Sequence, residues 1–290
     1  NLGDRIQVWT EITDVSEGTI TIDGNDFIRV KGEGSSTDQD GLKGFTYYTT
    51  DPSKLGEASI TKDNVTTVYT TFENALTAAQ AGDSGETSSA TEIELLKDVT
   101  ATNFNTTISK NVTIQGKEGL KIDLTTGSTS RNKAFTVSKD AKLTLDGVTM
   151  TISGSGEENQ GIGDGFDVQY GGTLELNDSN VTLSNLEAAT ISAKPQGSSA
   201  TETVTFTLNR STITATNIRG NFSNGGVWTL DSESAIEIDG CDAHGFSADR
   251  IEVKGNSTID VDNTAYRGIS INSTGLGEDT NGGLIIETGS

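Results

Sequence analysis

Short runs in which apolar and polar residues alternate recur along most of this chain. A typical run has two apolar residues separated by one polar residue, as in the Leu-Thr-Leu of residues 143–145. This period of two is typical of β-strands that bury one face and expose the other. Equivalent runs are regularly spaced from residue 92 onward, and Leu230 precedes its equivalent Val253 by 23 residues. The spacing indicates a structural repeat.

The runs fall into three classes that follow one another in constant order. Three strands and three turns per repeat predict one coil of a triangular solenoid, whose equivalent strands stack in parallel about 4.8 Å apart. The first class comprises residues 143–145, 174–176, 206–208, 228–230 and 251–253; the second comprises 148–150, 181–183, 213–215, 236–238 and 259–261; the third comprises 135–137, 166–168, the runs around Ile191, Phe222 and Phe246, and 269–271. We therefore predict a right-handed parallel β-helix with three strands per coil. The alternative, an antiparallel sandwich, predicts no fixed register between strand classes.

The turns between the first and second classes are rich in Asn, Asp, Gly and Ser, as in 177–179 (Asn-Asp-Ser) and 255–257 (Gly-Asn-Ser). Asn, Asp and Gly tolerate the left-handed backbone that a sharp corner requires. Side chains of Asn and Ser stacked on successive coils can also bond to the backbone of a neighbouring coil. Trp228 shares the register of Phe206 and Ile251, which predicts that its ring lies in the core.

One segment before the repeats has a helical pattern. Phe72, Ala75, Leu76 and Ala79 form an apolar face at 3.6-residue spacing over residues 70–81, with Thr70 or Thr71 as N-cap and Gly82 beyond the end. An amphipathic helix here would cover the open end of the solenoid. Residues 1–66 contain short alternating runs broken by turn signals, which predict a small β-rich region or cap. The predicted division is therefore 1–66 and a helix-capped β-helix over 67–290.

The composition and the net charge limit the classes of binding partner that we expect. Apolar residues make up only 32% of the chain, which a solenoid tolerates because each coil buries a thin stripe. The formal net charge of −22 disfavours nucleic acid and anionic membranes, and an acidic surface can collect calcium. The single cysteine, Cys241, rules out an internal disulfide. We find no signal peptide or transmembrane stretch, and since the pattern stops within a coil we expect a longer parent chain.

The start of the repeats carries a resemblance. Residues 69–82 read YTTFENALTAAQAG, residues 91–99 read TEIELLKDV and residues 111–116 read NVTIQG. From about residue 66 to 290, the chain resembles pectin-lyase-like right-handed parallel β-helix proteins, in particular the β-helical regions of bacterial cell-surface adhesins. The resemblance implies an extracellular, cell-surface location and binding of glycans or host macromolecules.

The resemblance also extends to enzymes, because polysaccharide lyases and hydrolases are found among proteins of this fold. Hydrolases of this fold use paired aspartates and a Gly-His-Gly segment, whereas here only Ala243-His244-Gly245 is similar and no Asp-Asp pair occurs. No calcium and base signature of the lyases is found either. If the chain is an enzyme acting on a polysaccharide, we expect the set Asp164, Asp167, His244 and Arg267 to carry the reaction. No cofactor is predicted, and calcium is an open alternative.

A column of polar residues is the main candidate for ligand binding. The residues just before successive third-class strands should stack on neighbouring coils: Asp164, Glu187, Arg219, His244 and Arg267. Asp167 and Tyr170 lie near its N-terminal end, and the predicted ligand-binding residues are Asp164, Tyr170, Arg219, His244 and Arg267. Long loops at 194–204 and 272–283 are predicted to wall a groove beside this column. The hypotheses are an adhesin or binding module, a carbohydrate-active enzyme, and a rigid spacer of a larger surface protein.

Overall fold

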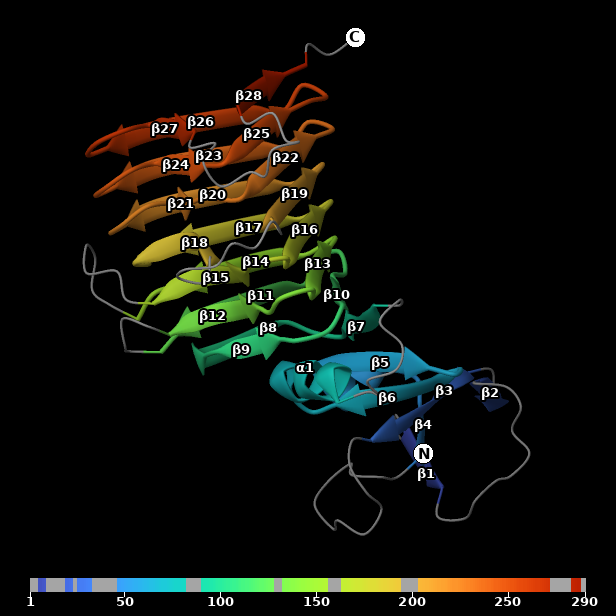
Figure 1. Ribbon diagram of the computed structural model, residues 1–290. Helices are drawn as coiled ribbons and strands as arrows, with labels where there is room; N and C mark the ends of the chain where they lie inside the picture. The colour runs from blue at the N-terminus through green and yellow to red at the C-terminus, as the bar shows by residue number, and fades with distance from the viewer. Residues whose placement is uncertain are drawn as a thin grey trace.

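The chain winds into a right-handed parallel β-helix, as the repeat predicted. The computed structural model describes residues 5–8, 19–22, 25–32, 46–81, 90–127, 132–155, 163–193, 203–271 and 283–287. Strands from successive coils stack side by side along one axis (Figure 1), and the second face alone contributes seven parallel strands. The protein is thus all-β apart from one α-helix and one short 3₁₀ turn among these residues.

Each coil supplies one strand to each of three faces. The first face contains β7 (Thr91–Leu95), β10 (Val112–Gln115), β13 (Lys142–Asp146), β16 (Thr173–Asn177), β19 (Thr205–Asn209), β22 (Val227–Asp231), β25 (Arg250–Val253) and β28 (Gly283–Ile286). The second contains β8 (Val99–Phe104), β11 (Lys121–Thr126), β14 (Thr149–Ser153), β17 (Asn180–Ser184), β20 (Thr212–Ile218), β23 (Ala235–Cys241) and β26 (Thr258–Thr264). The third contains β9 (Thr106–Ile108), β12 (Lys133–Val137), β15 (Asp164–Gln169) and β18 (Ala188–Ala193), followed by β21 (Ser223–Asn224), β24 (Phe246–Ala248) and β27 (Ile269–Ile271).

The predicted register is confirmed by the strand pairing. Leu230 pairs with Val253 between β22 and β25, and neighbouring coils pair in parallel on all three faces, which excludes the antiparallel sandwich. Trp228 is fully buried, and its ring stacks on that of Phe206 at 4.1 Å between centroids. One continuous apolar core, running from Ala58 to Ile251, fills the coil interior.

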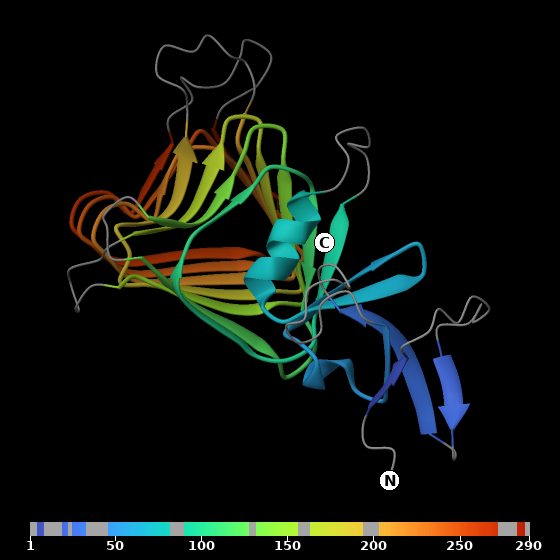
Figure 2. The same cartoon turned by 90° about the horizontal axis from the view of Figure 1, so that it is seen from below.

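The helix α1 (Phe72–Gln80) lies across the N-terminal end of the coil stack (Figure 2). Its N-terminus is capped by the Thr71 hydroxyl, which accepts a hydrogen bond from the Asn74 N–H, and by the Glu57 carboxylate, which accepts one from the Phe72 N–H. The apolar face predicted from the sequence is buried against the core. At the other end of the helix, Gln80 Oε1 accepts hydrogen bonds from the backbone N–H groups of Ser109 and Lys110, in the turn between β9 and β10. The helix therefore closes this end of the solenoid; Gly82 lies outside the described residues.

The N-terminal region forms a sheet that continues into the first face. It contains β1 (Arg5–Val8), β2 (Thr19–Ile22), β3 (Asn25–Gly32), β4 (Thr46–Thr49), the 3₁₀ turn η1 (Pro52–Lys54), β5 (Ala58–Lys62) and β6 (Val65–Tyr69). Most of its pairs are antiparallel, and β5 pairs antiparallel with β7 of the first coil. Hydrogen bonding therefore passes without a break from the β-rich region into the β-helix, and the 1–66/67–290 division stays a prediction.

The corner between the first and second faces contains a ladder of four serines, of which the first three are buried and the last is half-buried: Ser179, Ser211, Ser234 and Ser257. Each hydroxyl accepts a hydrogen bond from a backbone N–H on the preceding coil, at 3.0 to 3.1 Å, and the first such N–H belongs to Val148. The residues just before Ser179 and Ser211 have a left-handed backbone, with φ of 49° at both Asp178 and Arg210. We call this set the serine ladder. It satisfies corner N–H groups that the sheets themselves cannot pair.

Removing one hydroxyl from the serine ladder should weaken the fold. We expect Ser211→Ala to lower the free energy of unfolding by about 1–3 kcal/mol, because the buried Ser179 N–H then loses its acceptor. Chemical denaturation followed by circular dichroism measures this change. As a control, Thr182→Ala at an exposed outward position of β17 should change stability by no more than about 0.5 kcal/mol. Equal effects of the two substitutions would contradict the proposed role of the ladder.

Candidate functional site

The polar column predicted from the sequence lies along the corner between the second and third faces. Backbone hydrogen bonds at this corner join some of its members to residues of a neighbouring coil: Glu187 N–H donates to Gly163 O at 2.7 Å, Arg219 N–H to Leu186 O at 2.9 Å, and Gly245 N–H to Arg267 O at 2.8 Å. The register departs from the prediction at two places. Asp164 belongs to β15 and pairs with Ala188, and the pairing of Ser223 with Phe246 sets His244 beside Asn221 and not beside Arg219. The column divides into a buried acidic half and an exposed half.

The buried half is centred on β15. Asp164 is 6% exposed and Asp167 is 2% exposed. Lys133, on the neighbouring strand β12, forms an ion pair through its Nζ with Asp167 Oδ2, while Asp167 Oδ1 is buried and has no hydrogen-bond partner among the described residues. A buried carboxylate of this kind is stabilised by its cationic partner, because burying an unpaired charge carries a large free-energy cost. Lys133 therefore offsets the free-energy cost of burying these acidic side chains.

Burial raises the pKa of Asp164 to about 6. Desolvation is the main cause, and the nearby carboxylates of Glu187 and Asp167 raise this pKa further. The Lys133 ammonium and a hydrogen bond from the Ala188 N–H act in the opposite direction. A carboxyl group that titrates near neutrality is a property that catalytic acids share with structural buried acids. The raised pKa alone therefore does not assign a functional role to Asp164.

Two of the predicted ligand-binding residues are enclosed. Tyr170 belongs to the apolar core cluster and is buried, as is Asp164. Side chains that are only 6% and 7% exposed, as Asp164 and Tyr170 are, offer a ligand little surface to contact. Direct binding through the column is consequently restricted to its other half.

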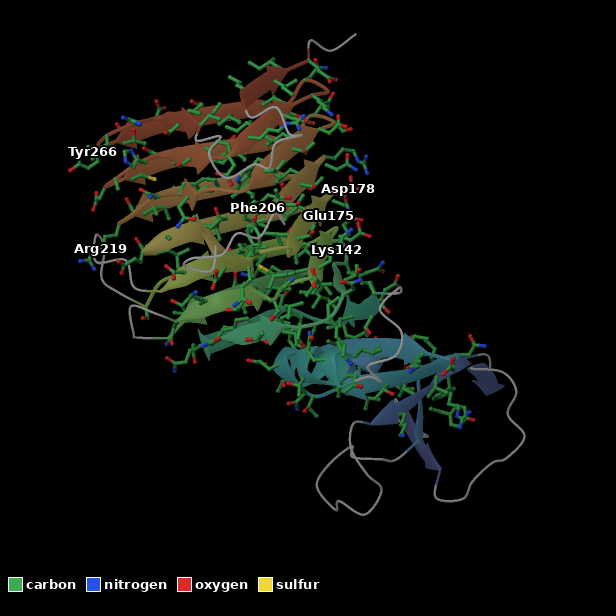
Figure 3. All side chains as sticks on the ribbon, in the orientation of Figure 1. Lys142, Glu175, Asp178, Phe206, Arg219 and Tyr266 are labelled. Atoms are coloured by element: carbon green, nitrogen blue, oxygen red, sulfur yellow. The ribbon has the colours of Figure 1, made fainter. Side chains whose placement is uncertain are left out.

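The exposed half, which we call the corner row, comprises Glu187, Arg219, Asn221, His244, Tyr266 and Arg267. Arg219 Nη1 lies 3.9 Å from Glu187 Oε2, and the Arg219 side chain is 54% exposed. Asn221 Oδ1 accepts a hydrogen bond from the His244 N–H at 3.0 Å. The ring of Tyr266, 74% exposed, lies 5.6 Å from that of His244. Arg219 and Tyr266 project from the same side of the coil stack, opposite Lys142, Glu175 and Asp178 (Figure 3).

The structure does not bring the four alternative catalytic residues together. Asp164 and Asp167 belong to β15 in the third coil, whereas His244 precedes β24 and Arg267 precedes β27, three and four coils further on. With coils about 4.8 Å apart, Asp164 and Arg267 are separated by about 19 Å along the axis. Residues so far apart cannot act on one glycosidic bond together.

No metal-binding geometry emerges from the described residues. They contain no group of three or more His, Cys, Asp or Glu side chains suited to hold an ion. At Asp167 the positive charge comes from Lys133. Cys241 is free and buried, and desolvation raises the pKa of its thiol to about 11, so it is a poor nucleophile at neutral pH.

Part of the predicted site lies outside the described residues. This concerns residues 194–202 and 272–282, nearly all of the two loops expected to wall a groove. Conversely, sequence reasoning missed Lys133, Asn221 and Tyr266. Lys133 could have been found from its register, since it pairs with Asp164 31 residues later, and Tyr266 from its position beside Arg267.

Comparisons with known proteins leave the family open. The chain matches no protein-family profile, no curated protein and no solved structure. Among the described residues, no helix has the length and apolar character needed to cross a membrane. The parallel β-helix architecture therefore rests on the structure itself.

Replacing Asp164 should reveal its raised pKa as a pH-dependent stability. The folded pKa of about 6 exceeds the ordinary value of 3.8, so ionised Asp164 destabilises the fold above pH 6 and this penalty is lost as the pH falls towards 4. We therefore compare the free energies of unfolding of Asp164→Asn and wild type by urea denaturation at pH 5 and pH 7.5. We expect the difference, variant minus wild type, to be about 1–2 kcal/mol larger at pH 7.5 than at pH 5.

The control for this measurement is Asp178→Asn. The Asp178 carboxylate is exposed and paired with Arg210, which lowers its pKa. Its replacement should therefore not raise the free energy of unfolding at pH 7.5. A difference between Asp164→Asn and wild type that does not change with pH would contradict the assignment.

Proposed function

We propose that this chain is a binding module of a bacterial cell-surface protein, of the pectin-lyase-like adhesin type, that recognises glycans or host macromolecules through the corner row. The observation that carries the proposal is the exposed Tyr266 ring beside His244, with Arg219 and Arg267 along the same corner. A large exposed aromatic ring is the exception in this molecule, whose other described aromatic side chains are mostly buried.

The chemistry of the corner row suits a sugar chain. An exposed aromatic ring gives the apolar face of a sugar a surface to pack on. Arginine presents several N–H donors in a fixed fork, which can bond hydroxyl or carboxylate oxygens. The row runs parallel to the solenoid axis over four coils, a length of about 14 Å between its ends. That shape favours an extended ligand over a compact one.

Two other functions have a supporting observation each. A carbohydrate-active enzyme is favoured by the pKa of about 6 at Asp164, but this carboxyl is enclosed and no partner from the alternative catalytic set except Asp167 lies near it. A rigid spacer is favoured by the single continuous core and the serine ladder, which make a stiff rod. Neither alternative gives the exposed Tyr266 a role.

The binding proposal is tested by removing individual side chains of the corner row. A glycan array and a cell-binding assay with the intact chain identify the ligand, and Tyr266→Ala should then weaken binding by about three- to tenfold through the lost ring contact. Arg219→Ala should weaken it as well. The matched control is Arg210→Ala, which removes another exposed arginine that pairs with a carboxylate one coil away but lies at a different corner. Equal loss with Arg219→Ala and Arg210→Ala, or turnover of a polysaccharide without retention, would refute the proposal.

A further inference from the structure

A lysine and a carboxylate from neighbouring coils meet in a covered position on the third face. Lys133 of β12 contacts Asp167 Oδ2 of β15 through its Nζ, and β12 and β15 are the two central strands of a four-stranded sheet. The Asp167 side chain is 3% exposed, whereas the carboxylates that pair with other lysines among the described residues, Asp123, Glu175 and Glu252, are 16% to 36% exposed. The sheet therefore holds this pair in place with its carboxyl side shielded from water.

The Asp167 carboxyl group is only partly satisfied by this contact. Its Oδ1 is buried and has no hydrogen-bond partner among the described residues, so the contact that Lys133 makes with Oδ2 is not matched at the other oxygen. Charged forms of both groups lose hydration in such a place, which favours transfer of a proton from the ammonium to the carboxylate. The product of that transfer, an amine in contact with a carboxylic acid, is the reactant pair for an amide bond.

A second carboxyl group lies beside this pair. Asp164 is the register partner of Lys133 between β12 and β15, which sets their Cα atoms about 4.8 Å apart. Burial raises the pKa of Asp164 to about 6, and Lys133 and Asp167 both lie close enough to influence that pKa. Near pH 6 the Asp164 side chain therefore exists in protonated and ionised forms, as a group that gives and takes protons must.

We propose that the side chains of Lys133 and Asp167 join through an amide bond, and that Asp164 transfers the protons of this reaction. The bond links two adjacent coils covalently and releases one molecule of water. Amide formation from an amine and a carboxylic acid changes no oxidation state, so the reaction needs no oxidant or reductant. The ion pair described above is the state before the reaction. This site is separate from the corner row and independent of ligand binding there.

The reaction balances in atoms and in charge. The Lys133 ammonium first gives one proton to the Asp167 carboxylate, which leaves a neutral amine in contact with a carboxylic acid. The amine Nζ then attacks Cγ of Asp167, and the bond between Nζ and Cγ forms. Asp164 gives its proton to the departing hydroxyl group, which leaves as water when its bond to Cγ breaks, and takes one proton from Nζ in return. Asp164 ends as it began, and a neutral amide replaces two charges.

Two features of the site favour this condensation, which is unfavourable for separate amines and acids in water. The paired strands hold the reacting groups in contact, and such placement is equivalent to an effective concentration of about 10⁵ M or more. The amide also removes the buried carboxylate of Asp167, whose charge carries a free-energy cost as long as one of its oxygens has no partner.

The pair of Lys142 and Glu175 provides a matched comparison. It also joins neighbouring coils, between β13 and β16, but the two side chains are 41% and 24% exposed. Glu175 Oε1 accepts a further hydrogen bond from the Asn177 amide, so both of its oxygens have partners. Because water and hydrogen bonds stabilise the charged forms here, we expect no amide at this pair.

The mass of the intact, denatured chain tests the proposal. We expect wild type to be lighter than its sequence requires by one water molecule. Trypsin does not cut after a lysine whose amine is acylated, so the segment 132–139 should stay uncut at Lys133 and joined to the peptide that carries Asp167. Ring closure at Asp164-Gly165 would lose the same mass but leave these peptides apart, which would overturn the proposal.

Three variants separate the roles of the residues. Lys133→Arg keeps the positive charge but removes the amine, and it should have its full sequence mass. Asp164→Asn keeps the shape of the side chain and should slow formation of the link by about a hundredfold or more, followed by mass at intervals after synthesis. The control Lys142→Arg should lose water as wild type does.

A wild-type chain of full mass would overturn the proposal, and this measurement decides it even where a variant fails to fold. Equal rates of linking in Asp164→Asn and wild type, or a full mass in Lys142→Arg, would overturn it as well. An uncharged amide contributes equally to stability at pH 5 and pH 7.5, so the pH comparison for Asp164 given above is unaffected by the link.

Discussion

The in-register stacking of each coil on the one before it is the constraint on which the rest of this molecule depends. Parallel backbone hydrogen bonds join the coils on three faces, and the interior apolar residues lie directly on their equivalents. At one corner the backbone turns too sharply to continue the ladder, and the buried serine hydroxyls take over as acceptors. The same stacking lets a chain with few apolar residues hold a continuous core, because each coil shares its buried stripe with two neighbours.

Stacking also decides which polar side chains meet. Residues paired on neighbouring coils lie about 4.8 Å apart, so side chains separated by 23 to 31 positions in the chain become neighbours. Where the column is covered, carboxylates such as Asp167 need a cation, and Lys133 supplies it. Where it is uncovered, Arg219, His244 and Tyr266 are presented on a rigid edge. A single geometric rule thus produces both the enclosed acidic cluster and the surface to which we assign ligand binding.

The N-terminal end of the solenoid is closed by elements outside the coil repeat. At the N-terminal end the interior is covered by α1 and the edge strand is paired by β5. At the other end the described residues leave Leu284 and Ile269 about half exposed beside the long edge of β26.

The sequence by itself determined the coil repeat, the register of Leu230 with Val253, the inward position of Trp228 and the existence of helix α1. These features follow from local alternation and capping, which short stretches of chain encode. It also placed the polar residues at one corner, but it set Arg219 beside His244 where the register sets Asn221, and it could not separate the buried Asp164 and Tyr170 from the exposed Arg219. That separation, the Lys133–Asp167 pair and the exposure of Tyr266 were decided only by the tertiary structure. Burial and charge pairing depend on side chains from neighbouring coils and on what covers them, and no local pattern records this.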